Sequence, residues 1–184
     1  MNLVSRNEQL LWLLLGGAGL FFLWSRTQRG EELLARTVET SVETARDIIG
    51  NLTRGERNHN PGNIERGEPW IGLAPEQSDA RFATFSDAIY GIRALAKTLL
   101  TYQRVHALST IAQIVNRWAP PAENLTGAYA AAVARDVGVD VNTPLTLSDS
   151  NILAALTTAI IHHENGRVIY PSDIIAGGVH AALS

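Results

Sequence analysis

Residues 148–166 read SDSNILAALTTAIIHHENG and carry the strongest helix signals in the chain. Ser148 is of a type that favours the N-cap of a helix, and Gly166 is of the type that commonly ends one. The turns between them are largely apolar. We therefore predict a helix over Asn151 to His163, with Glu164 in its last turn.

Similar start and stop signals predict further helices on both sides of this segment. By contrast, residues 54–64 are too rich in Asn, Gly and Pro for a regular element, and residues 65–78 are also predicted to be irregular. Only residues 70–73 and 81–85 are compatible with short strands, so the predicted fold class is mainly α. The other predicted helices run from an N-cap at Ser86 to about Val105, from Ser109 or Thr110 to the break at Ala119-Pro120-Pro121, from Thr126 to Gly138, and from Pro171 and Ser172 onward.

Length and composition limit the classes of protein that the chain can represent. With 184 residues it is long enough for one ordinary domain with appendages. The absence of cysteine excludes a disulfide scaffold, a thiolate zinc site and a cysteine nucleophile. A pI near 5.9 argues against nucleic acid as a partner. A basic protein would suit an anionic cell envelope better, so the composition argues mildly against a cell-wall enzyme.

Residues 10–24 read LLWLLLGGAGLFFLW, which is an apolar run of 15 residues without a charge. It is shorter than the roughly 20 residues of a typical spanning helix, but Trp12 and Trp24 could lie at the two membrane interfaces. We predict a membrane anchor or signal-anchor over residues 1–28. A cleavable signal peptide and a buried core helix are the alternatives, and the residues before Ser25 form a poor cleavage site.

An amphipathic helix is predicted to follow the anchor over residues 29–52. Its apolar residues recur at spacings of three and four, which places them on one face. We interpret this segment as a stalk, with a specific oligomerisation coil as the alternative. The remaining residues, 53–184, form the predicted catalytic domain.

Glu164 is the best candidate for a residue with a chemical role. At the C-terminal end of an apolar helix, both the helix dipole and the surroundings favour the neutral acid over the carboxylate. A carboxylic acid that keeps its proton near neutral pH is what protonation of a glycosidic oxygen requires. The alternative is an exposed glutamate at a helix end that water stabilises.

The loop RGERNHNPGNI, residues 54–64, supplies amide and guanidinium groups that suit a neutral, polyhydroxylated ligand. The alternative is a loop whose asparagines form hydrogen bonds with its own backbone. Aromatic side chains near the helices could stack on sugar rings, although most aromatic residues at helical spacing belong to a core. The candidates in these two groups are Arg57, Asn58, Asn60 and Asn63 in the loop, and Tyr90, Tyr102, Trp118 and Tyr129 near the helices.

Five blocks of sequence together resemble a family of phage and prophage proteins, known as virion structural proteins or peptidoglycan-degrading enzymes. The resemblance covers about residues 54 to 178, which is nearly the whole predicted domain. The usual opening of the family has Asn where this chain has His59, so His59 is not expected to be essential. The blocks are RNHNPGNI (57–64), Trp70 with Gly72 and FATF (70–85), YGIRAL (90–95), WAPPAENLT (118–126) and HENG (163–166).

The segment IIHHENG, residues 160–166, is also similar to the end of the catalytic helix in lysozyme-like lytic transglycosylases and bacterial glucosaminidases. In those enzymes an Asn-rich loop like NPGNI follows the catalytic Glu, whereas here residues 60–64 precede Glu164 by about 100 residues. The resemblance therefore implies a lysozyme-like helical domain that is circularly permuted. This is an analogy at the level of the fold.

The resemblance implies that Glu164 protonates the bond between N-acetylmuramic acid and N-acetylglucosamine and then acts as the general base. A transglycosylase needs only this carboxylate, because the muramyl 6-hydroxyl attacks intramolecularly. A hydrolase needs a second carboxylate, for which Glu123 is preferred over Glu56 and Asp79. With the family blocks included, the candidate substrate-binding residues are Arg57, Asn58, Asn60, Asn63, Trp70, Tyr90, Trp118, Asn124, Tyr129 and Asn165.

Other kinds of chemistry have little support in the sequence. His162 and His163 are adjacent and point to different sides of a helix, and no HExxH spacing exists, so neither a metal nor another cofactor is predicted.

The alternative function is a non-enzymatic, membrane-anchored virion protein with a glycan-binding domain. The expected partners are peptidoglycan strands, a membrane through residues 10–24, and other virion proteins. The expected location is the virion or its membrane, or the host inner membrane with the domain in the periplasm.

Overall fold

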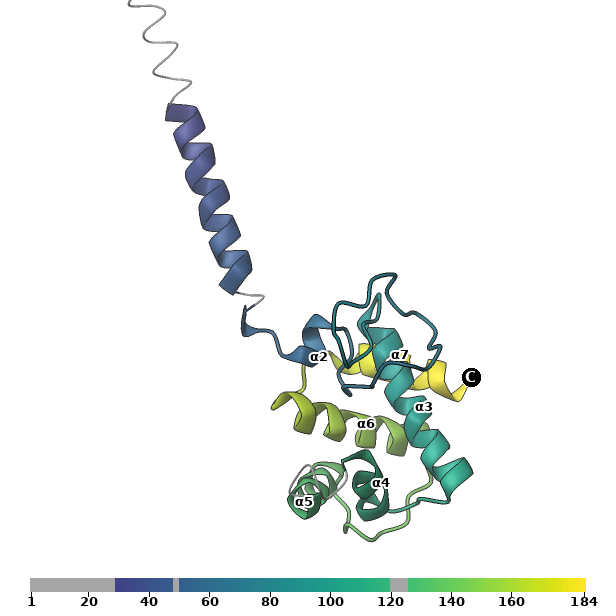
Figure 1. Cartoon of the computed structure of the whole chain (residues 1–184). Coiled ribbons are helices and arrows are strands. Elements are labelled where there is room, and N and C mark those ends of the chain that lie inside the picture. The colour runs from purple at the N-terminus through teal and green to yellow at the C-terminus, as the bar shows by residue number, and fades with distance from the viewer. Residues whose placement is uncertain (1–28, 48–49, 120–125) are drawn as a thin grey trace, which may run out of the picture. The chain divides into compact units, whose positions relative to one another are not determined.

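A computed structural model describes residues 29–47, 50–119 and 126–184 of the chain (Figure 1). The predicted anchor, residues 1–28, and two candidate site residues, Glu123 and Asn124, lie outside the described residues. The chain divides into two units, Met1–Asn51 and Leu52–Ser184, and each is treated by itself.

The described part of the first unit is helical, over residues 29–47 and 50–51. Its apolar residues Leu33, Leu34, Val38 and Val42 are all exposed. Threonine hydroxyls on this helix donate to backbone carbonyls four residues earlier, as Thr37 does to Leu33 at 2.8 Å. The predicted helix is therefore present, and its apolar face is open. Within the part of the chain that the structure describes, no helix is both long and apolar enough to cross a membrane.

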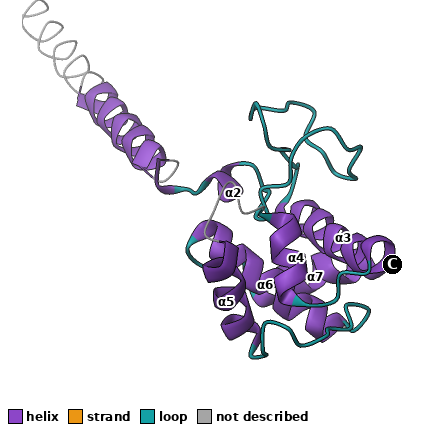
Figure 2. Cartoon of the chain, turned by 60° about the horizontal axis from the view of Figure 1, so that its bottom comes forward, coloured by secondary structure: helices purple, strands orange, loops and turns teal. Residues whose placement is uncertain are grey.

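The second unit is built from helices and long loops, as Figure 2 shows. No strand occurs in its described residues, which contain two isolated bridges. Leu73 with Phe85 joins the two segments for which short strands were considered, and Glu65 with Phe82 joins residues 81–85 to the loop before residue 70. The prediction of a mainly α-helical fold is confirmed. The helices are α2 (Arg54–Arg57), α3 (Ala88–His106), α4 (Ile111–Trp118), α5 (Thr126–Val137), α6 (Ser150–Asn165) and α7 (Ser172–Leu183).

The helix ends follow capping chemistry, with small corrections to the sequence-based bounds. Thr110 forms a capping box with Gln113 at the start of α4, and Gly166 ends α6 at a φ of 70°. The N-caps of α3 and α6 are Asp87 and Asp149, each one residue after the predicted serine. In both cases a carboxylate accepts hydrogen bonds from the first N–H groups of the helix, where negative charge is also favoured.

The short helix α2 was missed, because residues 54–64 were predicted to be irregular throughout. Thr53 accepts from the Glu56 N–H, and the Glu56 carboxylate accepts from the Thr53 N–H, so the two residues form a capping box. This pattern is a recognised start signal, and it was obscured by the Gly, Asn and Pro residues that follow it. At the other end of the domain, Pro171 is the N-cap of α7 and not its first helical residue.

The core of the second unit is centred on α6, which contacts α2, α3, α5 and α7. Helix α3 packs on α7, and α5 packs on α4. Each fully buried aliphatic side chain contributes roughly 1.5–3 kcal/mol by leaving water. Because α6 is held on several sides, the end of the helix that carries Glu164 has a fixed position. The largest fully buried side chains include Phe85, Ile92, Leu95, Leu99, Ile114, Leu147, Leu153, Leu156, Ile160 and Ile161.

Candidate active site

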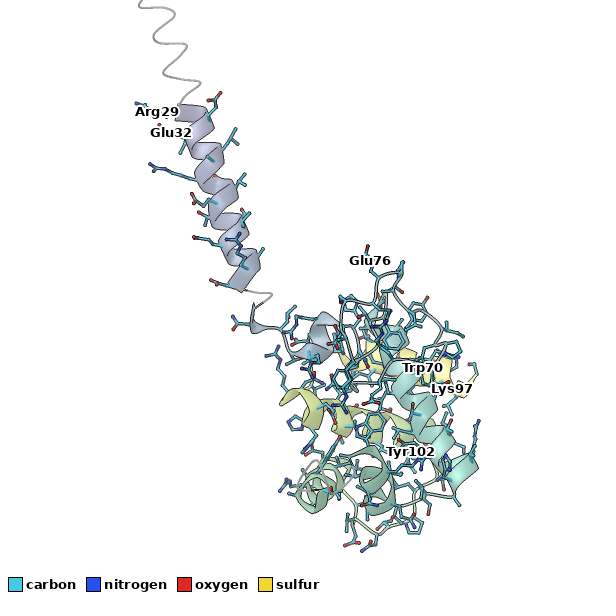
Figure 3. All side chains as sticks on the ribbon, viewed as in Figure 1. Arg29, Glu32, Trp70, Glu76, Lys97 and Tyr102 are labelled. Atoms are coloured by element: carbon cyan, nitrogen blue, oxygen red, sulfur yellow. The ribbon has the colours of Figure 1, made fainter. Side chains whose placement is uncertain are left out.

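A cleft of about 730 Å³ lies between the loop after α2, the second half of α3, the end of α4 and the end of α6. Trp70 from the loop and Tyr102 from α3 lie along it, and both are labelled in Figure 3. Glu164 is the contribution of α6 to this cleft. The volume of the cleft falls in the range of about 300–1,000 Å³ that is usual for small-ligand sites.

Three side chains from three different elements donate hydrogen bonds to the carboxylate of Glu164. Oε1 accepts from the Tyr129 hydroxyl at 2.9 Å and from the Trp118 indole N–H at 3.1 Å. Oε2 accepts from Nδ2 of Asn63 at 3.0 Å. All three donors are neutral, and Glu164 forms no ion pair with a described residue. The carboxylate is therefore fixed in orientation but not neutralised.

Tyr129 comes from α5 and is buried, with 3% of its surface exposed. Burial raises the pKa of Tyr129 far above its usual range, and the charge of Glu164 and the hydrogen bond to it act in the same direction. The His163 ring stacks on the tyrosine with centroids 3.5 Å apart. Tyr129 thus remains protonated and donates to Glu164 across the physiological pH range.

Trp118 is the last residue of α4, and its position is fixed by Tyr102 of α3. The two rings meet edge to face, with centroids 6.3 Å apart and an interplanar angle of 68°. Such pairs stabilise a fixed ring orientation in addition to the area that they bury. The indole N–H is thereby directed at Glu164.

Asn63 holds a left-handed backbone conformation, with a φ of 47°, that asparagine adopts more readily than most residues. Its Nδ2 contacts Glu164, while its Oδ1 is buried and has no hydrogen-bond partner within the described chain. A half-turn of the amide would present Oδ1 to Glu164 in place of Nδ2. Asn63 can therefore accept a hydrogen bond from a carboxylic acid or donate one to a carboxylate, so it suits both protonation states of Glu164.

Comparison with known proteins gives one informative match. No family model matches the chain. Protein P5 of Pseudoalteromonas phage PM2 is 37% identical over 155 residues, which cover 82% of this chain and 95% of that protein. The chain belongs to the P5 family. Its relative is a phage protein, in agreement with the phage origin that the sequence blocks predicted.

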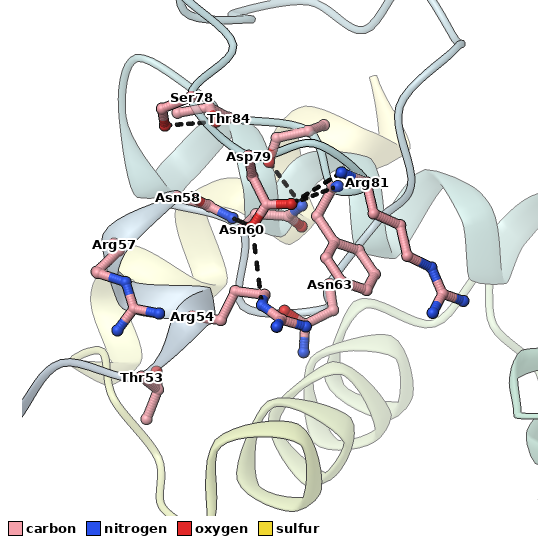
Figure 4. A network of polar contacts seen from close by, with 12 residues as sticks. Thr53, Arg54, Arg57, Asn58, Asn60, Asn63, Ser78, Asp79, Arg81 and Thr84 are labelled. Atoms are coloured by element: carbon pink, nitrogen blue, oxygen red, sulfur yellow. Dashed lines mark hydrogen bonds and ion pairs between the residues drawn. The ribbon is translucent and has the colours of Figure 1, made fainter. Parts of the chain in front are cut away.

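In this P5-family protein, two of the predicted ligand-binding asparagines are buried and form their hydrogen bonds within the protein. Asn60 is fully buried, and its amide donates to the carbonyls of Ile64 and Ala83 and accepts from the Ile64 N–H. Asn58 is also buried and donates to Asp79 at 3.0 Å (Figure 4). Asn60 therefore binds the backbone of its own loop, as the alternative interpretation proposed, whereas Asn58 binds a carboxylate outside residues 54–64.

Three more predicted binding residues of the P5-family chain lie outside the lining of the cleft. Asn165 donates to the carbonyls of Pro61 and Ile161, and its Oδ1 accepts from Thr53, so it links α6 to the segment around α2. Arg57 donates to the Leu52 carbonyl at 2.6 Å. Tyr90 packs against Gly72, where a Cβ atom would overlap its ring.

Two of the acidic residues considered as a second carboxylate, Glu56 and Asp79, are also engaged elsewhere. Burial raises the pKa of Glu56, but hydrogen bonds from the Thr53 N–H and from Arg167 outweigh it and lower the net value. The backbone N–H groups of Phe82 and Arg81 lower the pKa of Asp79 to about 2, with smaller contributions from neighbouring side chains. Both carboxylates therefore stabilise local structure.

Two other carboxylates, Glu65 and Glu68, line the cleft of the P5-family chain together with Glu164. The sequence analysis missed both, because no motif marks them and only the folding of the loop brings them to the cleft. Glu65 pairs with Arg81 at 2.7 Å, and Glu68 is exposed. Among the described residues, no three His, Asp or Glu side chains are grouped closely enough to hold a metal ion.

Proposed function

We propose that this P5-family chain is a phage enzyme that cleaves the glycosidic bond between N-acetylmuramic acid and N-acetylglucosamine in peptidoglycan. Glu164 is the general acid and base. The observation that carries the proposal is the position of Glu164 in the cleft, where three neutral donors orient its carboxylate. A carboxyl group with a chemical role has to be oriented without being paired with a permanent cation.

The chemistry needs two proton transfers at Glu164, in which one proton leaves the carboxyl group and another returns to it. Glu164, as the acid, donates its proton to the glycosidic oxygen while the bond to the anomeric carbon breaks. The resulting carboxylate then takes a proton from the hydroxyl group that attacks this carbon. Asn63 can remain hydrogen-bonded to Glu164 in both protonation states, because its amide offers a donor to the carboxylate and an acceptor to the acid.

The described lining of the cleft favours a lytic transglycosylase over a hydrolase, with the preferred second carboxylate, Glu123, lying outside the described residues. The transglycosylase needs one carboxylate, because the muramyl 6-hydroxyl attacks the anomeric carbon of its own sugar and forms a 1,6-anhydro ring. Of the carboxylates in the described lining, only Glu164 is held by neutral donors. Glu65 is bound to Arg81 and Glu68 is exposed, so neither is prepared to activate a water molecule.

A non-enzymatic glycan-binding protein of the phage particle is the second candidate. One observation favours it. Each oxygen of Glu164 is already hydrogen-bonded within the protein, as in a structural carboxylate that braces three elements. In that case the cleft would bind a glycan strand without cleaving it, and substitution of Glu164 would change stability more than any activity.

Zymography on peptidoglycan separates the two candidates. We expect the full-length protein to clear peptidoglycan and Glu164→Gln to lose at least about 100-fold of the activity, which is the usual scale for a general acid. Glutamine keeps the shape of Glu164, and the Oδ1 atom of a turned Asn63 amide can accept from the Nε2 group of the glutamine. Glu68→Gln is the matched control, since it removes a charge from the same cleft and should remain active.

The products identify the reaction. Mass spectrometry should find 1,6-anhydromuramyl ends for a transglycosylase and reducing ends for a hydrolase. Clearing by Glu164→Gln at the rate of the parent protein would refute the proposed role of Glu164. No clearing by the parent protein would favour the binding protein.

We further propose that the protein is part of the phage particle and attaches to a membrane through residues 10–24. The support is the uncharged run of 15 residues in the sequence, together with the phage relative. Purified particles should contain the full-length chain, and detergent rather than high salt should extract it. Its absence from particles would place it in the infected cell instead.

A further inference from the structure

The positive charge of the domain is concentrated along the cleft. Residues 52–184 contain ten Lys and Arg and twelve Asp and Glu, so the domain as a whole is slightly acidic. The described lining of the cleft has the opposite balance, with four arginines and three glutamates. The lining thus carries one more basic than acidic side chain, whereas the domain as a whole carries two more acidic than basic ones. The four arginines are Arg54, Arg66, Arg81 and Arg117.

Two of these arginines have no carboxylate within ion-pair distance in the described chain. Arg66 donates to the backbone carbonyl of Asp79 at 3.1 Å. Arg117 contacts a ring nitrogen of His106 at 3.2 Å, and its guanidinium lies over the Tyr102 ring at 5.1 Å. Both side chains are exposed, so their charges are open to a ligand. Arg66 belongs to the loop after α2, whereas Arg117 belongs to α4.

The other two arginines are held in place next to Phe82. The guanidinium carbons of Arg54 and Arg81 lie 5.0 and 5.1 Å from the centre of that ring. Arg54 also pairs with Asp79 at 3.7 Å, and Arg81 pairs with Glu65. The charges of Arg54 and Arg81 are therefore partly compensated, and these two arginines contribute less than Arg66 and Arg117 to the potential at the cleft.

We propose that the cleft selects a glycan strand that carries carboxylates, and that Arg66 and Arg117 are the residues that bind them. Arginine pairs with carboxylates through two parallel N–H groups, which gives both affinity and orientation. A neutral chitin chain offers no such partner. This inference rests on the proposed function, since it names the substrate that the same cleft prefers.

A peptidoglycan strand can offer two kinds of carboxylate: those of the stem peptide, which is joined to the lactyl group of muramic acid by an amide bond, and the lactyl carboxylate itself where the peptide has been removed. Binding measurements on the full-length Glu164→Gln protein can compare three soluble probes without cleavage. The probes are glycan strands with stem peptides, strands from which an amidase has removed the peptides, and neutral N-acetylglucosamine oligomers. Tighter binding of the amidase-treated strands would assign the lactyl carboxylate, and tighter binding of the peptide-bearing strands would assign the stem peptide.

In the Glu164→Gln background, we expect Arg66→Gln and Arg117→Gln each to weaken binding of the carboxylate-bearing strands by about two- to fivefold. The double substitution should weaken it by about tenfold. These factors correspond to exposed ion pairs. Binding of the neutral oligomers should change little, and the preference for carboxylates should decline with rising salt. Arg104→Gln is the matched control, because Arg104 is exposed on α3 and lies outside the lining of the cleft.

Equal affinity for neutral and carboxylate-bearing chains would overturn the inference, and so would an unchanged preference in the double variant. These results can be told apart from failure of the proposed function. If the parent protein binds carboxylate-bearing strands through the two arginines but never cleaves them, the inference holds and the enzymatic proposal fails. If the parent protein cleaves neutral and anionic strands equally well, the enzymatic proposal holds and the inference fails.

Discussion

Asn60 is expected to be the most important single residue for the stability of the loop that places Asn63 next to Glu164. In Asn60→Ala, the Ile64 N–H and the Ala83 carbonyl lose the hydrogen bonds that the buried amide makes with them. The structure gives these two backbone groups no other partner within the described chain. Each unsatisfied buried group costs about 1–3 kcal/mol, so we expect a loss of about 4 kcal/mol in the free energy of unfolding.

Thermal unfolding of the full-length protein, followed by tryptophan fluorescence, measures this loss. For a domain of this size, about 4 kcal/mol corresponds to a decrease of roughly 10–15 °C in the melting temperature. Asn63→Gly is the matched control three residues away. Glycine accepts the φ of 47° and removes only the bond to Glu164, so the melting temperature should fall by less than about 5 °C.

The two variants should separate activity from stability, since Asn63→Gly should affect mainly the activity and Asn60→Ala mainly the stability. If Glu164 acts as proposed, Asn63→Gly should lose about tenfold of the activity on peptidoglycan, because one hydrogen bond to a charged group is removed. Asn60→Ala should lose activity at the temperature at which it unfolds. The reasoning would be refuted if Asn60→Ala melted within about 3 °C of the parent protein, or if both variants melted at the same temperature.

Three further predictions concern stability. Gly91→Ala should unfold the domain or destabilise it by more than about 3 kcal/mol in chemical denaturation, because the new Cβ would lie 2.0 Å from the His59 carbonyl oxygen. Thr157→Val should raise the melting temperature, because its fully buried hydroxyl has no partner in the described chain; an unchanged or lower value would contradict this. Hydrogen bonds from the Phe82 and Arg81 N–H groups lower the pKa of Asp79 from 3.8 to about 2, so its contribution to stability is complete above pH 3.8 and is lost as the pH falls toward 2. Asp79→Asn should show a weaker dependence of the melting temperature on pH in that range.

Local sequence signals were sufficient to predict most of the helices. Thr110, Gly138 and Gly166 mark helix ends by chemistry that operates within one or two turns of chain. The errors at the starts of α3 and α6 are single-residue shifts between neighbouring capping residues, which local sequence distinguishes poorly. The helix α2 was missed because four residues give too short a pattern for periodicity.

For the candidate site, the sequence by itself determined that Glu164 stands at the end of an apolar helix. It could not determine what surrounds the carboxylate, because Asn63, Trp118 and Tyr129 are 101, 46 and 35 residues away along the chain. No periodicity or capping rule acts over such separations, so only the packing of the helices and the loop decides these contacts.

Tertiary structure also decided which residues of the Asn-rich loop line the cleft and which hold the loop together. Asn58, Asn60 and Asn63 are the same residue type in one short segment, and composition alone treats them alike. Burial separates them, since the first two are enclosed and must satisfy their hydrogen bonds within the protein. The same folding collects four arginines along one cleft of a slightly acidic domain, a distribution that a sum of charges cannot reveal.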